Sequence, residues 1–167
     1  HDEEWGKPEF NDAKLFEIFI LETMQAGLSW STILRKRENM RKAFDKFDYK
    51  VIAEYDDDKK KSLLEDEGII RNRLKIDALI SNAKAFMKIQ EEYGSFSKYI
   101  WKFTEDKPIV NKWESISQVP AKTEISDKMS KELKKKGFKF AGSTICYAFM
   151  QATGMVNDHM VWCSEYR

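Results

Sequence analysis

Apolar residues recur at spacings of three and four along most of this sequence. The longest run lies from about Asn72 to Tyr93 and ends at Gly94; its apolar residues are Ile76, Leu79, Ile80, Ala83, Phe86 and Met87. This spacing matches the 3.6-residue turn of an α-helix that buries one face. No segment of useful length alternates between apolar and polar residues, as a half-buried strand would. The sequence therefore predicts an all-α fold.

Capping residues and glycines divide the rest of the chain into further helices. Asn11 or Asp12 is expected to begin a helix that Gly27 stops; Ser29 or Ser31 begins a second, which buries Ile33, Leu34, Ala43 and Phe44. A short helical turn is expected around Val51, followed by a helix that Asp56 to Asp58 cap, that carries Leu63 and Leu64 and that ends by Gly68. Further helices are expected to begin at Ser95 or Ser97, at Ser126 and at Ser143. Residues 104–124 hold two prolines and show little periodicity, so we expect an irregular segment there.

Length and composition limit the class of protein. The chain of 167 residues is long enough for one domain with its own core, and its two cysteines, Cys146 and Cys163, are too few for a disulfide framework. No run approaches 18 uninterrupted apolar residues and no signal peptide is visible, which argues against a membrane protein. We therefore expect a soluble, cytoplasmic protein with a single domain over residues 1–167.

The net charge of +1 by itself argues against a nucleic-acid partner, for which an excess of basic residues is typical. The charges are unevenly distributed, however. Residues 1–25 carry seven acids and two lysines, whereas Arg35–Lys42 carries five bases and one acid, and Lys128–Lys139 carries six lysines and one acid. Each basic stretch is either a solvated helix surface or part of a binding surface, and the charges alone do not decide between them.

Glu22 lies seven residues after Leu15 and four after Ile18, so a helix places its carboxylate on the apolar stripe of the first helix. A carboxylate there is costly unless it is paired, hydrogen-bonded or used. An acid in a partly apolar pocket recognises a cation or acquires a shifted pKa, which makes Glu22 a candidate site residue. The alternative is a glutamate at the helix end that swings out or pairs with a nearby base.

The residues from Gln25 to Trp30 join the first two expected helices. Gly27 permits a tight turn, and Leu28 then lies at its tip. An exposed apolar tip beside a basic helix can act as a wedge between stacked bases, although a leucine that caps the core at a helix corner is commoner. Trp30, and Trp5 near the start of the chain, either stack on a base or a cation or belong to the core.

The sequence GIIRNRLK at residues 68–75 forms a short turn before the longest helix. It combines backbone amides at a helix start with the bases Arg71, Arg73 and Lys75, which suits a contact with a DNA phosphate. Residues 139–144, where the last helix begins, offer a second and weaker anion site.

His159 and Cys163 are four residues apart, a spacing that lets one helical segment present two ligands to a metal ion. The other histidine is His1, so a zinc site needs both ends of the chain and a fourth ligand. Cys146, on an apolar helix, is expected to be buried as a small hydrophobic residue.

Seven segments, in order along the chain, carry a resemblance to a known family. They are HDEEWG (1–6), LE (21–22), QAGLSW (25–30), RKREN (35–39), GIIRNRLKI (68–76), KGFKFAGSTICYAFMQATG (136–154) and VNDH (156–159) followed by Cys163. The chain closely resembles the 3-methyladenine DNA glycosylase I family, part of the helix-hairpin-helix DNA glycosylase superfamily. The resemblance covers nearly the whole chain and weakens only around residues 104–124. It implies an all-α, helix-hairpin-helix fold with a pocket for a flipped, alkylated base.

The resemblance also implies roles for residues of this chain. Glu22 would contact the damaged adenine, and Trp30 and Trp5 would be pocket walls. Gln25, Gly27 and Leu28 would form the turn that fills the gap left by the extruded nucleotide. The DNA-binding hairpin would comprise Gly68, Ile69, Ile70, Arg71, Arg73 and Lys75.

For the metal, the resemblance implies a structural Zn²⁺ held by His1, His159 and Cys163 together with a cysteine that precedes His1 in the family. The same preceding segment would supply a pocket tyrosine and a further tryptophan. Either this sequence lacks a short N-terminal segment of the protein, or the zinc site and part of the pocket are absent.

The activity that the resemblance implies is base-excision repair. A monofunctional, monomeric DNA glycosylase would flip 3-methyladenine out of alkylated double-stranded DNA and release it hydrolytically, leaving an abasic site, with no lyase activity. N3-alkylation makes adenine cationic and weakens its glycosidic bond, so we expect recognition by aromatic faces and Glu22 to matter more than general-base catalysis. A rival hypothesis is a DNA-binding module that keeps the basic surfaces but has no turnover.

Overall fold

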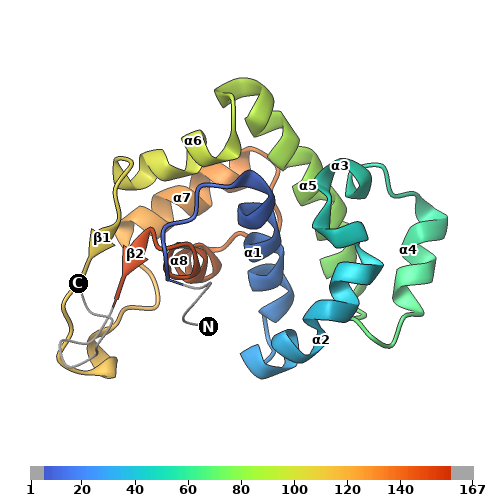
Figure 1. Cartoon of the computed structure of the whole chain (residues 1–167), viewed down its shortest axis with the longest axis horizontal. Helices are drawn as coiled ribbons and strands as arrows, with labels where there is room; N and C mark the ends of the chain where they lie inside the picture. The colour runs from blue at the N-terminus through green and yellow to red at the C-terminus, as the bar shows by residue number, and fades with distance from the viewer. Residues whose placement is uncertain (1–5, 159–167) are drawn as a thin grey trace.

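A computed structural model describes residues 6–158, most of which lie in eight α-helices (Figure 1). These are α1 (Asp12–Gln25), α2 (Trp30–Ala43), α3 (Tyr49–Ile52), α4 (Asp57–Leu64), α5 (Arg73–Tyr93), α6 (Phe96–Trp101), α7 (Glu124–Lys135) and α8 (Ser143–Ala152). Short 3₁₀ turns lie at Asp45–Phe47, Lys102–Thr104 and Ile116–Gln118. The prediction of an all-α fold is confirmed, with one small addition: β1 (Ile109–Val110) pairs in parallel with β2 (Val156–Asn157).

Most helices begin where their capping residues predict. The side chains of Asn11, Ser29, Asp56, Asn72 and Ser95 each accept a backbone N–H from the first turn of the helix that follows. Two helices differ: the N-cap of α8 is Gly142, which has no side chain to cap with, and the N-cap of α7 is Thr123 rather than Ser126. Ser126 lies one turn further on and completes a capping box, because its hydroxyl accepts the Thr123 N–H while the Thr123 hydroxyl accepts the Ser126 N–H.

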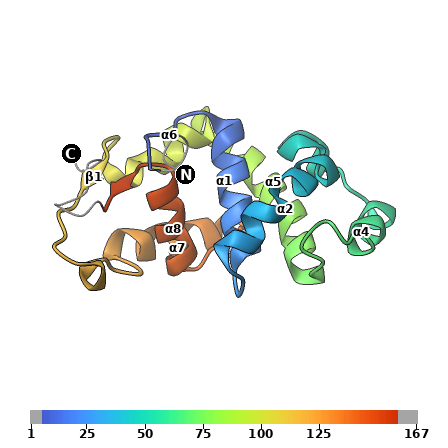
Figure 2. The same cartoon turned by 60° about the horizontal axis from the view of Figure 1, so that its bottom comes forward.

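Helix α1 runs through the middle of the molecule, with α2 and α5 on one side and α6, α7 and α8 on the other (Figures 1 and 2). Phe16 packs edge-on against Phe86 of α5, and Phe19 packs in the same way against Phe149 of α8. Such neighbours bury nearly the whole C-terminal half of α1, from residue 18 to residue 24. The apolar stripe expected for an amphipathic helix is therefore replaced by burial on almost every side, which includes Glu22.

Helix α2 covers α1 with a narrower face than the sequence predicts. Ile33 and Met40 are its buried residues, whereas Leu34, which we expected in the core, is 46% exposed. The reason is that α2 lies at the surface and packs with one edge, next to the partly buried Arg37. Arg37 and Arg41 both pair with Glu17 of α1, at 2.8 and 2.9 Å.

The segment 104–124 is irregular as expected, apart from β1 and one 3₁₀ turn. It is held by Asp158, at the end of the described residues. The Asp158 carboxylate accepts hydrogen bonds from Asn111 and Trp113 of this segment, and from Tyr147 and Gln151 of α8. Strands β1 and β2 lie far apart in the sequence and pair through backbone hydrogen bonds, which explains why local periodicity does not reveal them.

The turn between α1 and α2 and the start of α5 lie at the same edge of the molecule in both views (Figures 1 and 2). The fold thereby brings together two of the segments that the sequence singles out, residues 25–30 and 68–75. No helix among residues 6–158 combines the length and the apolar character needed to cross a lipid bilayer.

Candidate active site

Glu22 lies in the last turn of α1 and is only 5% exposed. Burial raises its pKa from 4.5 to about 7, and burial is the sole cause of the shift. Among residues 6–158, no hydrogen bond or ion pair reaches its carboxylate. The side chain therefore neither swings out to solvent nor pairs with a described base. A buried acid in this state gains stability from any cation that enters beside it.

Gln25 to Leu28 form a tight turn directly after α1. Ala26 has φ −47° and ψ 116°, Gly27 has φ +82°, and the Leu28 N–H donates to the Gln25 carbonyl over 2.6 Å. These values define a type II turn, whose third residue needs a positive φ, and this explains the glycine. The turn brings Leu28 to the surface, where it is 40% exposed. Leu28 is thus an apolar tip rather than a cap on the core.

Two tryptophans are expected as pocket walls. Trp30 begins α2, two residues after Leu28, and is partly buried against the hydrophobic core. Glu22 and Trp30 therefore flank the same short turn, one on each helix. Trp5 lies outside the described residues.

The connection between α4 and α5 divides the expected hairpin residues into two groups. Ile69 and Ile70 are buried, and Gly68 packs so closely on α2 that an added Cβ would lie 3.2 Å from a side-chain carbon. Arg71 and Arg73, in contrast, are exposed. The first group shapes the connection, and the two arginines are the members whose side chains face solvent.

Lys75 does not lie where a phosphate contact requires it. It is 5% exposed, and its ammonium donates to the carbonyls of Met24 and Ala26, over 2.7 and 2.6 Å. Desolvation lowers its pKa. The expectation that Lys75 binds DNA is therefore corrected: two backbone oxygens already occupy its charged end. Lys36 of α2 behaves similarly, donating to two carbonyls of the α4–α5 connection.

The start of α8 is a better anion site than the sequence indicates. No side chain caps α8, whose N-cap is Gly142, whereas the side chain of Asn72 already accepts the Lys75 N–H at the start of α5. The loop before α8 is fixed by the buried Asn82, which donates to the Lys139 carbonyl and accepts the Lys139 N–H. The first amides of α8 thus remain open to an anion on a rigidly held loop.

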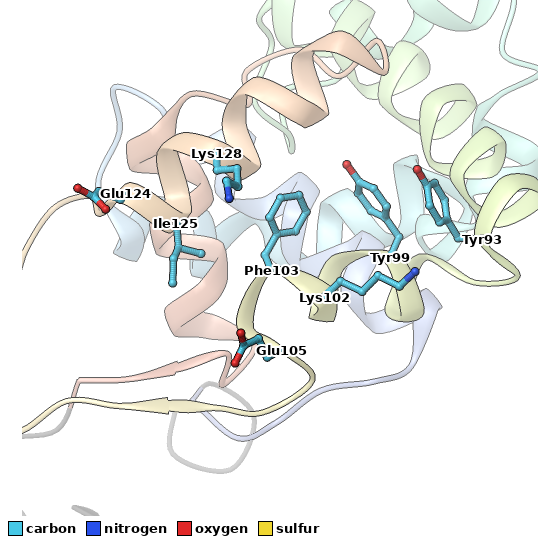
Figure 3. Close-up of a pocket in the computed structure, with 8 residues that line it drawn as sticks. All are labelled: Tyr93, Tyr99, Lys102, Phe103, Glu105, Glu124, Ile125 and Lys128. Carbon is cyan, nitrogen blue, oxygen red and sulfur yellow. The ribbon is translucent and has the colours of Figure 1, made fainter.

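A separate cavity of about 530 Å³ opens between α6 and α7 (Figure 3). The rings of Tyr93, Tyr99 and Phe103 lie along one part of it, and side chains of α7 lie along another. None of its lining residues belongs to α1, to the type II turn or to the α4–α5 connection. This cavity is therefore distinct from the site that contains Glu22.

Residues 6–158 contain no cluster of three histidine, cysteine, aspartate or glutamate side chains that could hold a metal ion. The expected zinc ligands His1, His159 and Cys163 all lie outside the described residues. Cys146 is fully buried, as predicted, and burial raises the pKa of its thiol to about 12. At neutral pH that thiol is protonated and is a poor metal ligand.

Comparison with known proteins adds a relationship to this geometry. A family model described as methyladenine glycosylase matches residues 1–166. The chain belongs to the methyladenine glycosylase family. It is 48% identical over 166 residues to DNA-3-methyladenine glycosylase 1 of Escherichia coli, covering 99% of this chain and 89% of that protein. It is 50% identical over 163 residues to DNA-3-methyladenine glycosylase of Haemophilus influenzae, covering 98% and 88%.

The fold of the family is shared as well. The structure of 3-methyladenine DNA glycosylase I from Staphylococcus aureus, solved to explain recognition of 3-methyladenine, superposes with a TM-score of 0.96 at 34% identity. The match covers 100% of this chain and 89% of that one. The chain therefore has the fold of that glycosylase over its whole length, including the helix that carries Glu22 and the type II turn.

In this member of the methyladenine glycosylase family, sequence reasoning missed the structural roles of Lys75 and Asn82. The signal was present, because Lys75, Ala78, Asn82, Ala85 and Ile89 follow one another at spacings of three and four and are all buried in α5. A stripe with that spacing faces the core, so a lysine or an asparagine on it needs a partner inside the protein.

Proposed function

We propose that this member of the methyladenine glycosylase family is a DNA repair enzyme that releases 3-methyladenine from alkylated double-stranded DNA. The observation that carries the proposal is Glu22, a buried carboxylate with no partner among residues 6–158, next to a turn with an exposed apolar tip. The similar proteins of E. coli and H. influenzae are DNA-3-methyladenine glycosylases. All site residues come from one chain, so a monomer suffices, and we expect it to act on DNA in a bacterial cytoplasm.

Recognition rests on charge. Methylation at N3 makes the adenine cationic, and a cation beside Glu22 stabilises the ionised carboxylate that burial disfavours. Unmethylated adenine brings no charge and leaves that carboxylate uncompensated or protonated. An aromatic face such as that of Trp30 favours the same cation. The damaged base is therefore selected over the normal base by the free energy of one buried charge pair.

Release breaks the bond between C1′ of the deoxyribose and N9 of the base, and the bonding electrons leave with the base, which becomes neutral. Water adds its oxygen to C1′ and loses a proton, which leaves an abasic site. Because the alkylated base is a good leaving group, Glu22 acts mainly in recognition. Lys75, the one buried lysine among residues 6–158, is hydrogen-bonded to two carbonyls and is not available to form a Schiff base with the sugar. We therefore expect a monofunctional reaction without lyase activity.

The surface around the turn supports binding of a duplex. Arg71 and Arg73 are exposed beside the start of α5 and suit phosphate contacts, as do the open amides at the start of α8. Leu28 projects from the turn between the Glu22 helix and the Trp30 helix. An apolar side chain in that place fills the gap that a flipped nucleotide leaves in the base stack.

A structural zinc ion belongs to the same proposal. Two imidazoles and a thiolate, from His1, His159 and Cys163, are donors that zinc prefers, and a fourth ligand would complete a tetrahedral site. Zinc would tie the two ends of the chain together and take no part in the reaction. Asp158, which directly precedes His159 in the sequence, accepts hydrogen bonds from four side chains, and this fixes the point from which the proposed ligand segment begins.

The experiment that tests the recognition step compares two glutamine variants in the full-length protein. Glu22→Gln removes the buried charge, whereas Glu91→Gln removes an exposed charge on α5. We expect Glu22→Gln to lower the rate of 3-methyladenine release at least about tenfold, the scale on which loss of a hydrogen bond to a charged group acts. Affinity for undamaged duplex DNA should stay unchanged in both variants. An equal loss of release and of DNA affinity in Glu22→Gln would contradict the recognition role.

A further inference from the structure

Helix α1 ends without a basic side chain of its own in its last turn. The carbonyls of a last helical turn have no partners within the helix and carry the negative end of its dipole. Lys75, which is 51 residues away from Met24 in the sequence, supplies the missing cation by donating to the Met24 carbonyl over 2.7 Å. Lys75 thus caps the C-terminal end of α1, the helix that carries Glu22.

The second bond of Lys75 acts on the turn itself. The same ammonium donates over 2.6 Å to the carbonyl of Ala26, which belongs to the central peptide of the type II turn. Type I and type II turns differ by a rotation of about 180° of that central peptide, so its carbonyl points in opposite directions in the two forms. A buried cation beside the carbonyl favours one form only. Lys75 therefore selects the form in which Gly27 has φ +82°.

Lys75 also belongs to the first turn of α5, two residues after the exposed Arg73. Three features are thereby connected through one side chain: the start of α5, the end of the Glu22 helix and the turn that carries Leu28. We propose that Lys75 is a positioning residue that locks the turn from Gln25 to Leu28 in its type II form and joins it to the start of α5. This inference rests on the proposed function insofar as the locked turn presents Leu28 to a DNA duplex.

The test in function uses the full-length protein with Lys75→Met, which keeps the length of the side chain and removes its charge. Lys88→Met, an exposed lysine further along α5, is the matched control. We expect Lys75→Met to slow single-turnover excision from methylated duplex DNA at least about tenfold, since two hydrogen bonds from a charged group are lost. Affinity for free 3-methyladenine, which needs the pocket but not the turn, should remain at the wild-type value. Unchanged excision, or an equal loss of free-base affinity, would overturn the proposal.

A second test needs no catalytic activity, and so it distinguishes failure of this inference from failure of the proposed function. Gly27→Ala places a Cβ in open space, with no atom within 4 Å, so its only cost is the positive φ of the type II turn. If Lys75 imposes that turn, Gly27→Ala should destabilise the wild-type protein more than it destabilises Lys75→Met, because the freed peptide relaxes. Additive free energies of unfolding would overturn the lock.

Gly27→Ala also serves if Lys75→Met does not fold. In the presence of Lys75, this single variant should slow excision from duplex DNA and leave free-base affinity unchanged. Wild-type excision by Gly27→Ala would show that the form of the turn does not matter, and would equally overturn the proposal.

Discussion

The ammonium of Lys75 lies 2.7 Å from the carbonyl oxygen of Met24, which is two residues beyond Glu22 on the same helix. Two buried side chains of opposite charge, Glu22 on α1 and Lys75 on α5, thus meet the same end of α1 without pairing. Lys75 is hydrogen-bonded to the backbone, and Glu22 has no partner among residues 6–158. A salt bridge between them would neutralise the charge that a cationic base is proposed to meet. Because Lys75 binds the backbone carbonyls instead, the Glu22 carboxylate stays available for the cationic base.

The first prediction concerns stability. Folding raises the pKa of Glu22 from 4.5 to about 7, so the folded state holds this proton more tightly than the unfolded state does. Stability from this group is therefore full below pH 4.5 and falls as the pH rises to about 7, by roughly 3 kcal/mol in total. Glu22→Gln has no such group. From pH 5 to pH 8 the variant should therefore become more stable relative to wild type: its free energy of unfolding, measured with urea, should rise compared with that of the wild-type protein. A difference independent of pH would contradict the burial of an unpaired carboxylate.

The second prediction concerns the pH dependence of activity. Attraction of a cationic base requires the ionised form of Glu22, so kcat/KM should rise with pH through about 7, the pKa in the free enzyme. Once the cation is bound it favours the carboxylate, and the corresponding limb of kcat should shift to lower pH. Initial rates on methylated duplex DNA between pH 5.5 and 8.5 measure both. Coincident limbs for the two parameters would mean that the bound base carries no charge that Glu22 senses.

The third prediction concerns the DNA surface. If Arg71 and Arg73 each contact one phosphate, replacing either with glutamine should reduce the slope of log affinity against log salt concentration by about 0.9. Titration of a fluorescent undamaged duplex at several salt concentrations gives that slope. Lys88→Gln is the control, because Lys88 lies about 22 Å further along α5 and should leave the slope unchanged. Equal effects of all three substitutions would indicate a diffuse charge effect instead of two phosphate contacts.

The fourth prediction concerns zinc. Metal analysis of the full-length protein should find one equivalent of zinc per chain, and Cys163→Ser should reduce that amount and lower the melting temperature. Cys146→Ala, which changes the buried cysteine of α8, should keep the full equivalent of zinc. A protein that is free of metal and melts at the same temperature with or without a strong chelator would exclude a structural zinc site.

Most of the fold could be predicted from local signals, because helix starts are decided by side chains next to them. Asn11, Ser29 and Asn72 cap helices within one residue of their expected positions. The strand pair could not be predicted in this way, because α7 and α8 separate Ile109 from its partner Val156 in the sequence. Leu34 was misplaced because periodicity gives the direction of a helix face but not the width of its neighbour.

The candidate site divides along the same line. The burial of Glu22 follows from its spacing on α1, and the tight turn follows from Gly27. The destination of Lys75 does not follow from the sequence GIIRNRLK, where it reads as one of three bases near a phosphate site. Its partners are carbonyls of another helix end, and backbone carbonyls carry no sequence signal. Only its position on the buried stripe of α5 points inward.

The most direct test of the account is to incubate the full-length protein with methylated duplex DNA and to identify the bases released by liquid chromatography. We expect 3-methyladenine to be released at a rate far above its spontaneous loss, and each site to remain an uncleaved abasic site until alkali is added. Binding to the same DNA without release of 3-methyladenine, by a protein that circular dichroism shows to be folded, would contradict it and would identify a DNA-binding module instead.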